Sequence, residues 1–163
     1  MFKDLISLII PVYNGEEHLM KCFENIEKQD YRNLEIIFID NMSTDQTNNI
    51  LELYCSGKKN NFLLKCYKKG PSAARNMGIN FSNGKYISFL DVDDSITNDK
   101  YSILYEAIIK NPQCKVVFGI TRKKDANNDW KNNNYGDIKV GENCAPSAGL
   151  LWLSQFQHQV HPG

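Results

Sequence analysis

The sequence lacks the features that mark a secreted, membrane-spanning or zinc-binding chain. Its apolar runs are far shorter than the roughly 20 residues needed to cross a bilayer, and no signal-peptide core follows Met1. Its cysteines, an odd number of five, show no C-x-x-C spacing, which argues against a zinc site and a disulfide framework. We therefore expect a reduced, cytoplasmic protein whose Cys22 and Cys66 act as small buried hydrophobes.

An excess of charge of either sign is also missing. Nineteen basic side chains balance nineteen acidic ones, giving a net charge of zero. No basic field is available to attract nucleic acid, so we expect no nucleic-acid partner. The length of 163 residues suits about one domain with a sizeable core.

Glycine-rich phosphate-binding motifs are absent as well. No G-x-G-x-x-G follows the first apolar run, and no Walker A sequence is present. These absences exclude the usual dinucleotide and P-loop sites. A phosphate ligand would need a carboxylate-bound cation in place of a glycine-rich nest, which favours a nucleoside diphosphate held through a metal ion.

What is present is a regular alternation of short apolar runs and helical patterns. The runs predict strands at 5–10, 34–39, 62–67, 86–90 and 116–118, the third of them at or near a sheet edge. Continuously apolar strands are typical of parallel sheets that are buried on both faces. We therefore expect an α/β fold with a mostly parallel sheet, covered by helices on both faces.

Helix starts and buried helix faces can also be predicted. Capping-box spacing relates Asn14 to Glu17 and Ser43 to Gln46, Pro71 suits the first position of a third helix, and Thr97 or Asn98 is expected to cap a fourth. The residues expected to face the core are Leu19, Cys22, Phe23 and Ile26; then Ile50, Leu53 and Tyr54; then Ala74, Met77, Gly78 and Phe81; and then Tyr101, Leu104, Tyr105 and Ile108.

The character of the chain changes near residue 121. Residues 121–143 are rich in Lys, Asn, Asp and Gly and predict a long solvated loop, whereas 148–156 are apolar and predict the start of another helix. We divide the chain into an α/β domain at 1–121 and a second region at 122–163.

An acidic cluster, Asp91, Asp93 and Asp94, directly follows the predicted strand at 86–90. Ligands of open α/β sheets bind beyond the carboxyl ends of the strands. Adjacent carboxylates repel one another unless a cation lies among them, and oxygen ligands suit Mg²⁺ or Mn²⁺.

Two other interpretations of this cluster are a polar turn that caps the next helix and an EF-hand loop. An EF-hand starting at Asp91 is excluded, because its sixth and twelfth positions require Gly and Glu and here are Ile96 and Ser102.

Two other strand exits lie on the same predicted edge. They are Pro11-Val12-Tyr13-Asn14 and Asp40-Asn41. A base can lie against Tyr13, and Asp40 or Asn41 can accept its hydrogen bonds. Arg75, expected in the first turn of a helix, can bind phosphate. Singly, Tyr13 could be a packed turn residue, Asp40 an acid before a helix and Arg75 a surface ion-pair former, but one shared ligand explains all three.

Four stretches of this sequence resemble the family 2 glycosyltransferases with the GT-A fold. They are I-I-P-V-Y-N at 9–14, I-D-N-M-S-T-D at 39–45, A-R-N-M-G-I at 74–79 and F-L-D-V-D-D at 89–94. The resemblance covers about residues 4–120. It implies transfer of a sugar from a nucleotide-diphosphate donor to an acceptor, with inversion, using Mg²⁺ or Mn²⁺.

The resemblance also implies roles for individual residues and partners. Residues implied to bind the donor are Pro11, Tyr13, Asn14, Asp40, Asn41, Arg75 and Asp91, and those implied to bind the metal are Asp91 and Asp93. A UDP-type donor and a carbohydrate or lipid-linked acceptor are expected. A cytoplasmic location is expected too, with peripheral contact at the inner face of the membrane allowed.

Two departures from the family pattern bear on function. Asn41 stands where the family usually has a second acid, and an uncharged amide is a weaker acceptor that can shift base preference. The family's general base is an acid well downstream of its D-x-D motif, which corresponds to Asp91-Val92-Asp93 here, whereas Glu142 is the last acid of this chain. We therefore identify no catalytic residue and interpret 1–121 as donor-binding and 122–163 as an incomplete acceptor-side region.

Two other functions stay open at this point. One is a nucleotide-sugar-binding module without turnover. The other is a nucleotidyltransferase, which is disfavoured because such enzymes generally have a glycine- and arginine-rich loop after the first strand.

Overall fold

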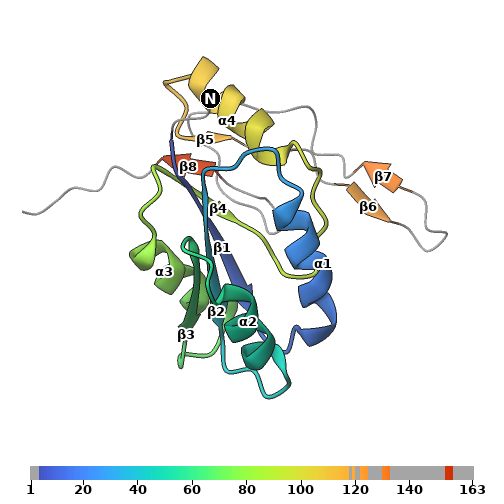
Figure 1. The fold of residues 1–163 in the computed structure, drawn as a ribbon. Coiled ribbons are helices and arrows are strands. Elements are labelled where there is room, and N and C mark those ends of the chain that lie inside the picture. Colours follow the sequence, from blue (N-terminus) through green and yellow to red (C-terminus); the bar gives the residue numbers. More distant parts are fainter. Residues whose placement is uncertain (1–3, 118, 120–121, 125–129, 133–152, 156–163) are drawn as a thin grey trace, which may run out of the picture.

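The protein is described by a computed structural model that covers residues 4–117, 119, 122–124, 130–132 and 153–155 (Figure 1). Its strands are β1 (Ile6–Val12), β2 (Leu34–Asp40), β3 (Asn61–Lys65), β4 (Tyr86–Phe89), β5 (Val116–Val117), β6 (Arg122–Lys124), β7 (Trp130–Asn132) and β8 (Leu153–Gln155). Its helices are α1 (Glu16–Glu27), α2 (Thr47–Cys55), α3 (Pro71–Phe81) and α4 (Lys100–Lys110).

The main sheet has the strand order β3-β2-β1-β4-β8-β5. β1 pairs in parallel with β2 and β4, and β2 pairs in parallel with β3. The predicted parallel α/β sheet is therefore confirmed, and β3 lies at its edge as expected. Parallel pairing of β2, β1 and β4 brings their carboxyl ends to one edge, where the predicted site residues lie.

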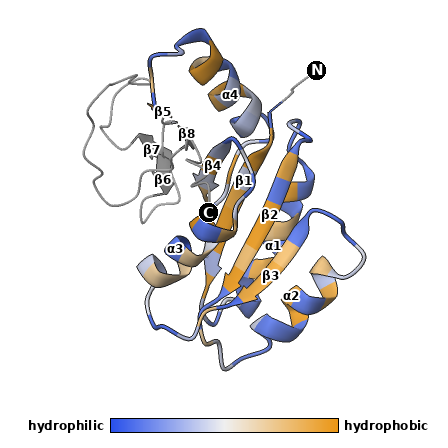
Figure 2. Ribbon diagram, turned by 90° about the vertical axis from the view of Figure 1, so that its left-hand side faces the viewer, coloured by the Kyte–Doolittle hydropathy of each residue, from blue (hydrophilic) through white to orange (hydrophobic). Residues whose placement is uncertain are grey.

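Both faces of this sheet are buried. Leu8 and Ile10 of β1 pack in the larger core cluster, which contains residues of α1, α2 and α4. Ile9, between them in sequence, points to the other face and packs in the cluster that contains Ala74 of α3. Figure 1 shows α3 on the opposite side of the sheet from α1 and α2, and Figure 2 shows the apolar character of the strands between them. Helices on both faces are thus confirmed.

The predicted helix faces are confirmed except at one residue of α2 and one residue of α3, and Ile50 and Tyr54 of α2 pack against the core as expected. On α2, Leu53 is 79 % exposed, whereas its neighbour but one, Leu51, is fully buried. Residues two apart lie about 200° apart around a helix, so the two leucines point in opposite directions. On α3, Phe81 is 38 % exposed, although its ring still contacts that of Phe62 on β3.

The predicted helix at 148–156 is wrong where the structure describes it. β8 is a strand that pairs antiparallel with both β4 and β5. A short apolar run does not distinguish a strand from a helix by periodicity, and here the backbone groups of β4 supply the pairing partner. The polar stretch at 121–143 also contains an antiparallel pair, β6 with β7, rather than loop alone. Phe118, the last residue of the strand predicted at 116–118, and the remaining residues of 121–143 and 148–156 lie outside the described residues.

The predicted capping boxes do not form. Gly15, Gln46 and Asp99 are the residues before α1, α2 and α4, and none of them caps its helix with a side chain. Asn14 instead adopts a left-handed conformation with φ of 47°. Local spacing failed here because the capping groups come from a neighbouring loop.

The loops after β1 and β2 cap each other. The backbone N–H of Gly15 donates to Thr47 Oγ1 at 2.8 Å, and that of Glu16 donates to Asp45 Oδ2 at 3.3 Å. In return, the Gln46 N–H donates to Glu16 Oε2 at 2.7 Å. The first N–H groups of α1 are therefore satisfied by the protein itself, and the two strand exits are fixed relative to each other.

This interlock gives a pH-dependent prediction for Asp45. Burial raises the pKa of its carboxyl group, but hydrogen bonds from Thr47 and Glu16 outweigh burial and leave the pKa below its ordinary value. The carboxylate thus stabilises the fold above the unfolded pKa of about 3.9, and this stabilisation is lost as the pH falls through the lower, folded pKa. We expect Asp45→Ala to reduce the free energy of unfolding by about 1 kcal/mol at pH 7, and by less near pH 3.

Urea unfolding at both pH values measures this effect. Asp99→Ala is the matched control, because Asp99 precedes α4 without making a side-chain cap. Equal losses in the two variants, or a loss at Asp45 that does not depend on pH, would contradict the interlock.

Candidate functional site

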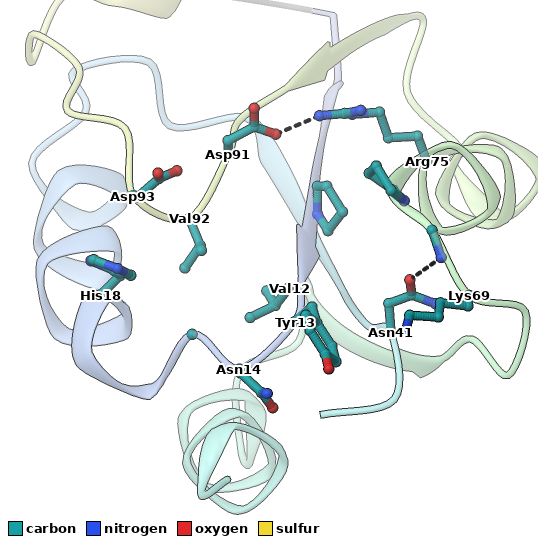
Figure 3. Close-up of a pocket in the computed structure, with 14 residues that line it drawn as sticks. Val12, Tyr13, Asn14, His18, Asn41, Lys69, Arg75, Asp91, Val92 and Asp93 are labelled. Carbon is teal, nitrogen blue, oxygen red and sulfur yellow. Dashed lines mark hydrogen bonds and ion pairs between the residues drawn. The ribbon is translucent and has the colours of Figure 1, made fainter. Parts of the chain in front are cut away.

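The ends of β1 and β4 and the start of α3 surround a cavity of about 540 Å³ (Figure 3). This volume is typical of small-molecule sites. The residues that line the cavity are Pro11, Val12, Tyr13, Asn14, Gly15, His18, Asn41, Lys69, Gly70, Pro71, Arg75, Asp91, Val92 and Asp93. The convergence predicted from the strand order is therefore present.

The exit of β1 contributes an open aromatic ring. Tyr13 is 55 % exposed, so the alternative of a packed turn residue is wrong. The neighbouring Asn14 accepts a hydrogen bond from the Thr44 N–H through Oδ1 at 2.8 Å. Tyr13 is thus available to a ligand, while the Asn14 side chain ties this loop to the loop after β2.

Arg75 and Asp91 form an ion pair within the cavity wall. Nη2 of Arg75 lies 2.6 Å from Oδ1 of Asp91, and the two side chains are 33 % and 51 % exposed. Such an exposed pair adds at most about 1 kcal/mol to stability. Arg75 is the fifth residue of α3 and lies beyond its first turn, which corrects the sequence expectation. The guanidinium group itself, rather than the helix end, brings positive charge to the cavity.

The three carboxylates of the acidic cluster do not all face the cavity. Asp91 and Asp93 line the cavity, whereas Asp94 does not. Burial raises the pKa of the Asp94 carboxyl, and the charges of Asp91 and Asp93 raise it further, while Lys100 opposes them. The three carboxylates are therefore close enough to repel one another.

Asp91 and Asp93 fit a hard divalent cation. Both offer carboxylate oxygens to the same cavity, and a cation between them would relieve their repulsion. Within the described ranges, no three His, Cys, Asp or Glu residues are grouped so as to hold a metal ion. An ion here would therefore take its remaining ligands from phosphates and water, as Mg²⁺ commonly does.

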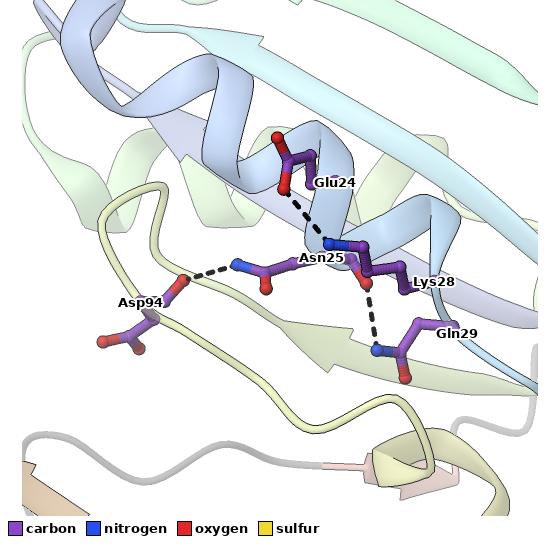
Figure 4. Close-up of polar contacts among 5 residues, drawn as sticks. All are labelled: Glu24, Asn25, Lys28, Gln29 and Asp94. Atoms are coloured by element: carbon purple, nitrogen blue, oxygen red, sulfur yellow. Dashed lines mark hydrogen bonds and ion pairs between the residues drawn. The ribbon is translucent and has the colours of Figure 1, made fainter.

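Hydrogen bonds also attach the end of helix α1 to the loop between β4 and α4, which carries the acidic cluster (Figure 4). Asn25 Nδ2 donates to the carbonyl oxygen of Asp94 at 3.3 Å. The buried Gln29 donates through Nε2 to the carbonyl oxygens of Asn25 at 3.0 Å and Thr97 at 2.8 Å. The backbone that carries the aspartates is thus attached to a core helix.

The two residues at the end of β2 are both buried, at 6 % exposure for Asp40 and 5 % for Asn41. Asp40 Oδ1 accepts a hydrogen bond from the Ser43 N–H at 3.1 Å, and Asp40 is not among the lining residues. Asn41 does line the cavity. The cavity therefore brings together every residue predicted for the site except Asp40.

Sequence reasoning missed several lining residues, among them His18 and Lys69. His18 projects from α1 on the side of Asp93, and Lys69 lies on the opposite side of the cavity, beside Asn41 (Figure 3). The available signal was positional, since Lys69 is in the turn that leads to α3 and His18 is in the first turn of α1. Neither residue type stands out in a loop or a helix that is otherwise polar.

Across the part of the chain that the structure describes, no helix has the length and apolar character needed to span a membrane.

Known proteins share both the sequence and the fold of this chain. The family described as "Glycosyl transferase family 2" matches residues 7–156. Glycosyltransferase GlyG of Streptococcus pneumoniae serotype 4 is 36 % identical over 117 residues, which are 71 % of this chain and 38 % of GlyG.

Two solved structures extend the comparison. Residues 1–349 of S. aureus TarS, in complex with UDP, are 30 % identical with a TM-score of 0.61, covering 68 % of this chain and 33 % of that one. The Pyrobaculum calidifontis mannosyltransferase PcManGT is 21 % identical with a TM-score of 0.64, covering 71 % of this chain and 35 % of that one, and supports the fold alone.

These comparisons bear on the fold and the family. The chain spans less than half the length of each of these proteins. The match to TarS confirms the expected GT-A fold. Because the family match extends from β1 to β8, it includes every strand of the main sheet and the cavity at its edge. The chain belongs to glycosyl transferase family 2.

Proposed function

We propose that this chain forms the donor-binding part of an inverting, metal-dependent glycosyltransferase. The observation that carries the proposal is the single cavity in which an exposed aromatic ring, an arginine and two carboxylates meet. These groups match the parts of a nucleoside diphosphate with its cation: a base, a diphosphate and a divalent metal.

A UDP-type donor is the proposed ligand. TarS, the 30 % identical relative, has been solved with UDP and with UDP-GlcNAc. In this chain the base and ribose would lie against Pro11, Tyr13 and Asn14, with Arg75 near the diphosphate. Asp40, which does not line the cavity, would act indirectly: its hydrogen bond with the Ser43 N–H orders the loop after β2.

The proposed metal is Mg²⁺ or Mn²⁺, held by Asp91 and Asp93. When bound, it would neutralise charge on the leaving diphosphate. The chain's own residues orient the donor: Tyr13 offers its ring, and Arg75 can donate further N–H groups beyond the one given to Asp91.

The rest of the proposal concerns the acceptor. We assign residues 1–121 to donor binding and 122–163 to the acceptor side. The proposed acceptor is a carbohydrate or a lipid-linked sugar, and the proposed location is the cytoplasm with contact at the inner face of the membrane.

Calorimetric titration tests the donor site directly. We expect UDP to bind in the presence of Mn²⁺ or Mg²⁺ and at least about tenfold more weakly after chelation. Uridine is the control, because it lacks the diphosphate and should show no metal dependence. The absence of binding by UDP, GDP, ADP and CDP, each with Mn²⁺, would refute the proposal.

A nucleotide-sugar-binding module without turnover is the second candidate. The observation that favours it is that the only carboxylates lining the cavity, among the described residues, are Asp91 and Asp93, and this proposal already assigns both to the metal. A general base for the acceptor hydroxyl would have to come from elsewhere. Product analysis with labelled UDP-sugars after the titration separates transfer from binding alone.

A further inference from the structure

Asn41 makes an unusual set of contacts for a residue in a ligand cavity. Its Nδ2 donates to the carbonyl oxygens of Cys66 at 3.0 Å and Lys68 at 2.8 Å. Its Oδ1 accepts from the N–H of Gly70 at 2.7 Å. Both amide donors are therefore used, and the partners are all backbone groups of one segment, 66–70, which we call the tethered segment.

The tethered segment forms a wall of the cavity. Lys69 and Gly70 line it directly, and Gly70 leads into Pro71 at the start of α3, the helix that carries Arg75. Gly70 has a φ of 117°, a conformation that side chains rarely adopt. A change in the path of this segment would therefore move both positively charged side chains of the wall.

Only an asparagine-type amide satisfies these three partners. Two carbonyl oxygens need two N–H donors, and the Gly70 N–H needs an acceptor. An ionised aspartate has no donor and would place its charge against the oxygens of Cys66 and Lys68, which is unfavourable at 5 % exposure. The amide at position 41 is thus matched to the segment rather than to a free ligand.

We infer that Asn41 is a positioning residue: its amide holds the tethered segment against the end of β2 so that Lys69 and Arg75 face the diphosphate. This inference rests on the proposed donor site. It differs from the sequence expectation, in which Asn41 itself accepts a hydrogen bond from the base. If Asn41 instead contacted the base directly, substitutions at position 41 would change the preference among bases without loosening the tethered segment.

The experiment combines amide hydrogen exchange by NMR with UDP titration in the presence of Mn²⁺. The variants are Asn41→Ala, Asn41→Asp and Asn41→Ser, and thermal unfolding identifies those that remain folded. Asn60→Asp is the matched control, because it makes the same charge change at an exposed residue just before β3. We expect the Gly70 amide to exchange at least about tenfold faster in each Asn41 variant.

UDP should bind about tenfold more weakly to the folded Asn41 variants and normally to Asn60→Asp. The loss in Asn41→Ala, which adds no charge, separates positioning from simple repulsion of the diphosphate by an aspartate. Normal UDP affinity in Asn41→Ala or Asn41→Ser, or unchanged exchange at Gly70, would overturn the inference. Failure of the unmodified chain to bind UDP, GDP, ADP or CDP with Mn²⁺ would instead refute the proposed function, while Gly70 exchange would still decide whether the tether exists.

Discussion

Alanine at Asp93 is expected to abolish most of the metal-dependent part of UDP binding while leaving the fold intact. Asp93 lines the cavity together with Asp91, and no third metal-binding side chain joins them among the described residues. Removal of one of two carboxylates therefore takes away half of the protein's ligands. We expect a loss of on the order of 100-fold in UDP affinity with Mn²⁺, since even outer-shell changes at metal sites cost 10- to 100-fold.

Calorimetry with and without Mn²⁺ measures this loss, and the neighbouring Asp94 provides the control. Asp94 belongs to the same acidic run but does not line the cavity. Asp94→Ala should keep the Mn²⁺ enhancement. Both substitutions should slightly stabilise the metal-free protein, because each removes a like charge from the cluster. An equal enhancement by Mn²⁺ in Asp93→Ala and the unmodified chain would exclude Asp93 as a ligand.

The sheet was predictable because its strands satisfy one strong condition. A strand such as β2, buried at all seven of its residues, must have helices on both faces, so its residues are apolar apart from Glu35 and Asp40. Parallel pairing then follows from the intervening helices, and it brings the ends of β1 and β4 together. Asp91 lies beside Arg75 because of the sheet topology. That topology can be predicted from short motifs that follow one another in the right order along the chain.

The parts that failed depend on contacts between distant segments. The capping of α1 by Asp45 and Thr47 involves residues about thirty positions away, so no local spacing reports it. Likewise, β8 is a strand because β4 and β5 offer it backbone partners, and this depends on the sheet rather than on residues 153–155. Local patterns describe an element's preference, while tertiary partners decide its end or type.

The site shows the same division. Tyr13 and Asp91 are predictable because they follow predicted strands, whereas Lys69 lies in the turn before α3, where the sequence gives no sign of a ligand. Asn41 was located correctly, but its hydrogen-bond partners could not be inferred. The chemistry of its amide becomes informative only when the backbone groups of the tethered segment are placed around it.

A buried polar network near the start of β4 leads to the largest expected effect on stability. Glu35 of β2 is 4 % exposed and accepts hydrogen bonds from the Ser7 hydroxyl and from the N–H groups of Asn83 at 2.5 Å and Gly84 at 3.1 Å. Gly84 N–H also donates to Ser7 Oγ at 2.8 Å. The turn between α3 and β4 is thus closed onto β1 and β2, and a buried carboxylate remains satisfied only while this turn stays in place.

Gly84→Ala should therefore destabilise the protein severely. A Cβ at this position would lie 2.6 Å from the backbone nitrogen of Ser7, and backbone in a central strand cannot move aside. Displacing the turn would also remove donors from the buried Glu35 carboxylate. Together these effects predict a loss of roughly 3 kcal/mol in the free energy of unfolding, or about 10 °C in Tm for a chain of this size.

Gly57→Ala is the control that separates crowding from backbone strain. Gly57 has a φ of 74°, but a Cβ there would meet nothing within 4 Å, so only a conformational cost of about 1 kcal/mol is expected. Thermal and urea unfolding of the two variants give the comparison. Equal losses would mean that the turn relaxes around the new methyl group, and the Glu35 network would then not be the rigid closure that its hydrogen bonds indicate. A loss at Gly84 about three times that at Gly57 is the result that close packing against Ser7 requires.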